Sequence, residues 1–262
     1  MTDIAKYGPW AVIVGGSEGV GSAFARQLAG DGFGVVLVAR NAERLEETAS
    51  EVRAAGAEVR TVPLDLLSET AVADLIAATD DLEVGLLILN AGANMHGGPF
   101  VGSDLDQQQE VLALNVLRQL PLVHHFAGKM VERQRGGVML VGSLSGYNGS
   151  PMEGIYAASK SFLRIFSEGL WVECKPKGVD VLHLVLGVTR TPAMERKGLN
   201  FDIPGMAVGE PDDVAAQGLS NLANGPVSIV EGNEQTARWK SGADRAKIVQ
   251  QAADAVAKIV GH

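Results

Sequence analysis

The stretch Trp10-Ala11-Val12-Ile13-Val14 runs directly into Gly15-Gly16-Ser17-Glu18-Gly19-Val20-Gly21, so a short apolar run is followed at once by a glycine-rich turn. The apolar run is continuous rather than alternating, which predicts a strand buried on both faces, as in a parallel sheet. After the turn, Val20, Phe24 and Leu28 recur every four residues and predict one buried helix face. Strand, turn and helix in this order form the first unit of an α/β fold.

The same alternation continues along the chain. Further strands are predicted at 34–39, 58–64, 84–89, 138–141, 179–186 and 226–230, and helices at 42–55, 68–79, 107–134 and 153–175. Strands that alternate with helices predict a doubly wound parallel sheet with helices on both faces. Since neither an internal repeat nor a low-complexity linker interrupts the pattern, we expect one domain over residues 1–262.

Composition excludes several classes of partner. The formal net charge of −9 and the absence of a basic run argue against nucleic acid and anionic membranes. Cys174 is the only cysteine, so an intrachain disulfide is impossible and a reducing cytoplasm is expected. No apolar run approaches the ~18 residues of a membrane span. The five histidines lack the spacing of metal ligands, so we expect no metal.

The glycine-rich turn favours a bound dinucleotide. Glycines let the backbone approach a pyrophosphate, whose charge then rests on the amide groups at the helix N-terminus. Arg40 follows the second predicted strand, where it could pair with a 2′-phosphate, so NADP(H) is preferred and NAD(H) remains possible. Glu18 opposes that preference, because its carboxylate could lie near the phosphate. Asp65, after the third strand, could contact the adenine or form a turn.

A second group of polar residues follows the strand at 138–141. Ser143 comes directly after it, and Tyr156 and Lys160 lie four positions apart, on one face of a predicted helix. An ammonium near a phenol favours the phenolate, so Lys160 is expected to lower the pKa of Tyr156 and suit it to acid-base catalysis. A tyrosine and a lysine can also share a helix face by chance.

Taken together, these residues make the chain similar to the short-chain dehydrogenase/reductase family over essentially its whole length. Gly15, Gly19 and Gly21 match the family's Gly-x-x-x-Gly-x-Gly turn, and Asn90-Ala91-Gly92 matches its motif after the fourth strand. Its catalytic tetrad corresponds to Asn115, Ser143, Tyr156 and Lys160, and Gly187 and Thr191 match a motif after the sixth strand. The resemblance implies a Rossmann-type sheet of about seven strands in the order 3-2-1-4-5-6-7.

The resemblance also implies an activity and a role for each residue. A hydride would pass between NADP(H) and a carbonyl or secondary alcohol, with Tyr156 as the acid or base and Ser143 holding the substrate oxygen. Lys160 would bind the nicotinamide ribose and Asn115 would position a water. The implied cofactor-binding residues are Gly15, Ser17, Gly19, Val20, Gly21, Arg40, Asp65, Asn90, Ala91, Gly92, Tyr156, Lys160, Val188 and Thr191. The alternative is a regulatory or scaffold protein that binds the cofactor without turnover.

The substrate is expected to be a hydrophobic small molecule. A lid is predicted over residues 189–211, and methionines and other apolar side chains suit an adaptable pocket. The candidate pocket residues are Met95, His96, Met152, Met194, Phe201 and Met206. Arg190, Arg196 and Lys197 leave open a substrate that carries a carboxylate or phosphate.

The end of the chain is unusual for the family. Residues 244–260 predict an amphipathic helix that could cover the sheet edge or the pocket, or dock on its own subunit. We expect a homodimer or homotetramer, and our hypothesis is that this helix blocks edge-to-edge assembly, which leaves a dimer built on the helices at 107–134 and 153–175.

Overall fold

Continuous apolar runs form the strands of one parallel sheet in the computed structural model, which describes residues 1–202 and 206–260, without the side chains of 255–260. The sheet order is β3-β2-β1-β4-β5-β6-β9, which confirms the predicted order. Its strands are β1 Trp10–Val14, β2 Gly34–Ala39, β3 Val59–Pro63, β4 Val84–Leu89, β5 Gly136–Ser143, β6 Val179–Leu186 and β9 Val227–Ile229. A small parallel pair, β7 Val188–Thr189 and β8 Val208–Gly209, stands apart from it.

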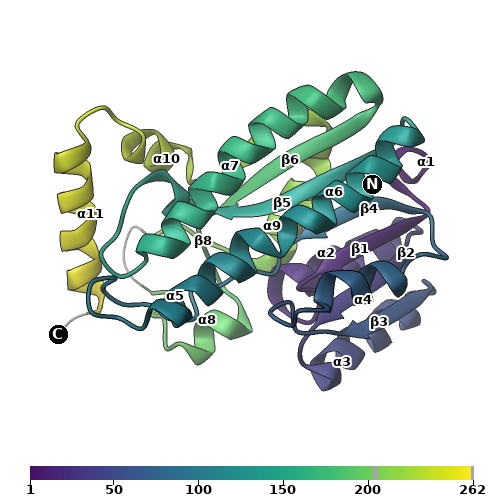
Figure 1. Cartoon of the computed structure of the whole chain (residues 1–262), viewed down its shortest axis with the longest axis horizontal. Coiled ribbons are helices and arrows are strands. Elements are labelled where there is room, and N and C mark those ends of the chain that lie inside the picture. Colours follow the sequence, from purple (N-terminus) through teal and green to yellow (C-terminus); the bar gives the residue numbers. More distant parts are fainter. Residues whose placement is uncertain (203–205, 261–262) are drawn as a thin grey trace.

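Helices cover both faces of this sheet (Figure 1). The α-helices are α1 Ile4–Tyr7, α2 Gly19–Gly30, α3 Ala42–Ala54, α4 Ala71–Ala77, α5 Leu105–Leu112, α6 Gln119–Glu132, α7 Gly154–Cys174, α8 Pro192–Arg196, α9 Pro211–Asn221, α10 Glu234–Lys240 and α11 Arg245–Val260. Helices α2, α3 and α9 pack on one face and α4, α6 and α7 on the other. No helix of the described part of the chain is both long and apolar enough to span a membrane.

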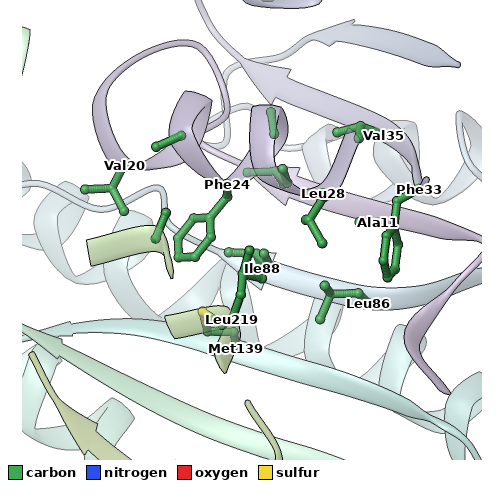
Figure 2. Packing of buried hydrophobic residues seen from close by; sticks show 14 of the residues in the cluster. Ala11, Val20, Phe24, Leu28, Phe33, Val35, Leu86, Ile88, Met139 and Leu219 are labelled. Carbon is green, nitrogen blue, oxygen red and sulfur yellow. The ribbon is translucent and has the colours of Figure 1, made fainter. Parts of the chain in front are cut away.

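Alternate residues of each strand enter different cores. Ala11 and Ile13 of β1 face the core beneath α2, whereas Val12 and Val14 face the core beneath α6 and α7. Figure 2 shows Phe24 and Leu28 of α2 packed towards the sheet. Burial on both faces explains why the apolar runs of the strands are continuous.

The predicted helix at 107–134 is wrong in detail, because three elements occupy it. A π-helical turn, Ala113–Leu117, separates α5 from α6. A π turn holds one more residue than an α turn and often lies at a functional site. The spacing of apolar residues over a long window does not reveal one extra residue in a single helical turn.

The predicted lid at 189–211 contains the short helix α8, and residues 203–205 of it lie outside the described residues. The helix predicted at 244–260 is present as α11. Figure 1 places α11 next to the loops at the carboxyl ends of the strands. An Arg245 guanidinium nitrogen donates to the Tyr147 carbonyl at 3.0 Å, so the first turn of α11 docks on the loop after β5.

Candidate active site

The glycine-rich turn fits against the loop that follows β4. Gly15 has a φ of +90°, and a Cβ atom there would lie 2.6 Å from the Ala91 nitrogen. A Cβ on Gly21 would lie 1.8 Å from the Gly15 carbonyl oxygen, which accepts a hydrogen bond from the Asn90 side chain at 2.8 Å. Glycine is therefore the only residue that fits at position 15 and at position 21. Since the N-cap residue of α2 makes no side-chain capping bond, the first amide groups of this helix suit a pyrophosphate.

The other residues expected to contact the cofactor have separate surroundings. Arg40 is exposed at the end of β2. Glu18 forms ion pairs with Arg44 at 3.5 Å and with Arg196 of α8, which contacts both carboxylate oxygens. Asp65 accepts a hydrogen bond from the Leu67 amide at 3.0 Å, so it forms the turn that was the alternative to an adenine contact. Ser17 and Val20 lie in the turn and at the start of α2.

Asn115 and Lys160 converge on Gly92. Asn115 is fully buried, and its amide donates to the Ala93 carbonyl at 3.0 Å and to the Val111 carbonyl at 2.9 Å. Its Oδ1 atom has no partner among the described residues. A Cβ on Gly92 would lie 2.6 Å from this oxygen and 2.9 Å from Lys160 Nζ, so both side chains face the same small space.

Ser143 and Tyr156 meet beside this space. Ser143 ends β5, and its hydroxyl accepts a hydrogen bond from the Ser145 amide at 3.1 Å. Burial raises the pKa of Tyr156 to about 12, whereas the hydroxyl of Ser143 lowers that pKa by hydrogen bonding. The residue as a whole keeps some exposed surface, although its phenol group is buried.

The expectation that Lys160 lowers the pKa of Tyr156 below its ordinary value is wrong in this structure. Lys160 is 3% exposed and donates a hydrogen bond to the Val141 carbonyl at 2.9 Å. Its nitrogen lies 5.6 Å from the centre of the Tyr156 ring. Burial lowers the pKa of Lys160 itself to about 8, so desolvation controls both groups.

The segment after β6 reaches back to the glycine-rich turn. Val188 begins β7, and Thr191 caps α8 by accepting a hydrogen bond from the Met194 amide at 3.3 Å. A Cβ on Gly19 would lie 3.0 Å from Thr191 Cγ2. Thr191 therefore lies against the dinucleotide turn while its hydroxyl caps the helix that begins the predicted lid.

Most of the expected pocket residues lie on loops that contact each other. The Met152 carbonyl accepts from the amide of Gly98 at 3.0 Å and from the side chain of Asn94 at 3.3 Å, which joins the loops that carry Met95 and Met152. Lys197 donates to the Asn94 carbonyl at 3.2 Å and ties α8 to the same loop. Met194, on α8, is 37% exposed.

The other candidates have different surroundings. His96 pairs with Glu110 at 3.0 Å, which holds its loop on α5. Phe201 stacks on Arg190, whose guanidinium carbon lies 4.6 Å from the ring centre. Met206 is half-buried. No cluster of metal-binding side chains occurs within the described ranges.

Two groups near the site were missed in the sequence. His183 is buried on β6, and burial, with Lys160 and Arg164 as further causes, lowers its pKa to about 3. Gln119, the first residue of α6, donates to the Ala91 carbonyl at 2.8 Å. The only available signal was a glutamine four positions after Asn115.

A hollow of about 360 Å³ near Trp10 lies at the amino ends of β1 and β2, away from all of these residues, and we assign it no role.

Comparisons with known proteins identify a family and several relatives. The family model for "short chain dehydrogenase" matches residues 9–200. A 7β-hydroxysteroid dehydrogenase of Clostridium sardiniense is 35% identical over 219 residues, which are 83% of each chain.

Solved structures extend the likeness to the whole fold. The structure of a 7β-hydroxysteroid dehydrogenase, solved to study stereoselectivity, has a TM-score of 0.87 at 28% identity and covers 96% of this chain and 99% of its own. A short-chain dehydrogenase of Sphingobium yanoikuyae in complex with NADPH has a TM-score of 0.78 at 30% identity and covers 93% of this chain and 95% of its own.

Proposed function

Because the chain belongs to the short-chain dehydrogenase/reductase family, an oxidoreductase family that acts on carbonyl and alcohol groups, we propose that it transfers a hydride between NADP(H) and a bulky hydrophobic ketone or secondary alcohol. The proposed catalytic residues are Asn115, Ser143, Tyr156 and Lys160. One observation carries the assignment: Asn115 Oδ1 and Lys160 Nζ face one space at Gly92, next to a Tyr156 whose hydroxyl interacts with Ser143.

Each side chain has a defined task in this proposal. When bound, the nicotinamide supplies or accepts the hydride. In the reducing direction Tyr156 donates its proton to the carbonyl oxygen, which Ser143 holds by a hydrogen bond. Lys160 uses one donor on Val141 and has two left for the ribose hydroxyls. The unpartnered Asn115 oxygen suits a water that links Lys160 to solvent.

The protonated state of Tyr156 suits reduction at neutral pH. Its pKa of about 12 keeps the phenol able to donate a proton. Oxidation of an alcohol needs the phenolate, so the oxidation rate is expected to rise with pH across the neutral and mildly alkaline range.

The preference for NADP(H) rests on charge. Arg40 is exposed after β2, from where it could pair with a 2′-phosphate, and Glu18, which would oppose such a phosphate, is paired with Arg44 and Arg196. Compensation of the Glu18 charge favours the phosphorylated cofactor, and NAD(H) remains the alternative.

A sterol-like ketone is the substrate class that we favour. Met95, Met152 and Met194 offer adaptable apolar surfaces, and the relative from Clostridium sardiniense is a 7β-hydroxysteroid dehydrogenase. Arg190, Arg196 and Lys197 each contact other groups of this chain, which weakens the case for a substrate recognised by its carboxylate or phosphate.

We further propose a cytoplasmic homo-oligomer.

The test is a substrate panel with both cofactors. Purified protein is mixed with NADPH or NADH and a 7-keto steroid, a bulky aryl ketone or a small aliphatic ketone, and cofactor oxidation is followed. We expect the steroid with NADPH to be the best pair. Tyr156→Phe is expected to abolish turnover while the cofactor dissociation constant stays within about threefold, since the phenol acts on the substrate.

Two outcomes would contradict this assignment. Retained activity of Tyr156→Phe would remove Tyr156 from its role. Tight cofactor binding without turnover of any ketone or alcohol would favour the alternative, a regulatory or scaffold protein of the same fold.

A further inference from the structure

Side chains in and directly after the π-helical turn hold two loops at the carboxyl ends of the strands. Asn115 donates to the Ala93 carbonyl at 3.0 Å, Arg118 to the Leu67 carbonyl at 3.3 Å and Gln119 to the Ala91 carbonyl at 2.8 Å. Leu67 belongs to the loop after β3, and Ala91 and Ala93 belong to the loop after β4. One short irregular segment therefore fixes both loops.

The orientation of the Gln119 amide follows from its neighbours. Its Nε2 atom also lies 3.4 Å from the Leu114 carbonyl, so two carbonyl oxygens surround this nitrogen. The reverse orientation would place an oxygen against both of them. The residue is 1% exposed, and its Oε1 atom has no partner among the described residues. Burial of an unpartnered oxygen is unfavourable, so an apolar side chain would serve packing better.

The carbonyl that Gln119 holds belongs to the residue that touches the glycine-rich turn. The Ala91 amide donates to the Val14 carbonyl at 2.6 Å, and a Cβ on Gly15 would lie 2.6 Å from the Ala91 nitrogen. Gln119 therefore holds the Ala91 carbonyl, and the end of β1 holds the Ala91 amide. A shift of Ala91 would move the loop at its contact with Gly15.

We propose that Gln119 is a positioning residue for the cofactor. Its amide fixes the Asn90-Ala91-Gly92 loop against the glycine-rich turn, so that the loop meets the dinucleotide in a preformed conformation. Gln119 acts through Ala91 and not on the substrate. The inference rests on the proposed function, because it takes this loop as part of the cofactor site.

The test compares two buried glutamines of the same helical region. Gln119→Leu removes the donor to Ala91, and the matched control Gln108→Leu removes a donor to the His96 carbonyl, 3.2 Å away on the later part of the loop. NADPH affinity is measured from its fluorescence during titration, and Tm is recorded for each protein. We expect Gln119→Leu to weaken NADPH binding by about tenfold and Gln108→Leu by less than about twofold.

A second variant distinguishes donation from packing and covers failure of Gln119→Leu to fold. Gln119→Glu has nearly the same shape, but its carboxylate would repel the Ala91 and Leu114 carbonyls, whereas the protonated acid could donate to Ala91. Relative to the unchanged protein at the same pH, NADPH binding by Gln119→Glu should recover as the pH falls from about 9 to about 6, since burial raises the pKa of a carboxyl group.

The results separate the two proposals. NADPH binding by Gln119→Leu within about twofold of the unchanged protein, equal losses in Gln119→Leu and Gln108→Leu, or no pH-dependent recovery in Gln119→Glu would overturn the role of Gln119. If the unchanged protein bound neither NADPH nor NADH, the proposed function itself would be contradicted.

Discussion

Lys160 shows, at the scale of a single residue, how the proposed chemistry opposes stability. Its ammonium is almost wholly buried, and the carbonyl of Val141 is its one hydrogen-bond acceptor among the described residues. Burial lowers its pKa from 10.5 to about 8, which corresponds to about 3 kcal/mol of unfavourable charge burial near neutrality. The charge of Lys160 serves the proposed reaction, but the folded protein would be more stable without that buried charge.

Replacement of Lys160 by methionine should therefore stabilise the protein and inactivate it. Below about pH 8 the folded and unfolded states are both protonated, so the cost of burial is fully present; between that pH and 10.5 the folded state loses its proton first and the cost disappears. We expect Lys160→Met to raise Tm by roughly 6–12 °C at neutral pH, with the gain shrinking towards pH 10.5. Calorimetry over this pH range, with turnover assays, tests the prediction. A lower Tm at neutral pH would contradict it.

His183 predicts sensitivity to acid. Its pKa falls from 6.5 to about 3, so an unfolded chain takes up a proton over this interval while the folded chain does not. Stability is therefore lost as the pH falls below 6.5. Between pH 7 and pH 4, His183→Leu should lose about 3 kcal/mol less stability than the unchanged protein. Urea unfolding at both pH values measures this, and equal losses would show that His183 does not titrate as described.

At the scale of elements, α8 connects the predicted lid to the dinucleotide turn. Arg196 contacts Glu18 in the turn, and Lys197 contacts the loop after β4. The Arg196 and Glu18 side chains are partly exposed, so this ion pair adds little to stability. We expect this ion pair to affect cofactor binding instead, because it changes the net charge next to the proposed cofactor site.

Arg196→Gln should weaken NADPH binding by about threefold and NADH binding by less, because it leaves Glu18 less compensated near the proposed 2′-phosphate. Raising the salt concentration should reduce the difference. Lys177→Gln is a suitable control, since Lys177 pairs with Glu173 at the end of α7, next to β6. Equal losses for both cofactors would mean that Glu18 lies away from the phosphate.

The irregular helix between β4 and β5 was the element that periodicity described least well. Apolar spacing predicted one helix over 107–134, whereas Asn115 sits in a π turn that separates two helices. Side chains in and directly after this turn contact the loops after β3 and β4. These loops come well before the turn in the sequence. Local propensity cannot reveal such contacts.

At the scale of the whole molecule, an apolar stripe on α7 points to self-association. Phe162, Ile165 and Val172 are 45%, 55% and 65% exposed, and on the neighbouring segment Leu112 and Leu117 are also exposed. Apolar side chains on one surface commonly mark an interface between proteins. Our hypothesis of a dimer built on these helices therefore remains a prediction with a defined surface.

Light scattering should give a dimer for the unchanged protein, and Phe162→Asp should shift it towards monomer, because a carboxylate would be buried at the interface. Trp239→Asp changes an exposed aromatic residue on α10 and should leave the dimer intact. A tetramer assembled through the edge strand β9 would refute the hypothesis that α11 blocks such assembly.

The sequence by itself was enough to predict the alternation of strands and helices, and its resemblance to a known family implied the strand order that the structure confirms and named the candidate site residues. Continuous apolar runs specify strands that are buried on both faces, because such strands need no polar side. Gly15, Asn90 and Ser143 were assigned to one site through the family motifs that they match. The tertiary structure alone decided the environment of each charge. Burial raises the pKa of Tyr156 and lowers that of Lys160, and the Ala91 carbonyl meets Gln119, because desolvation and hydrogen bonding depend on which distant segments surround a group.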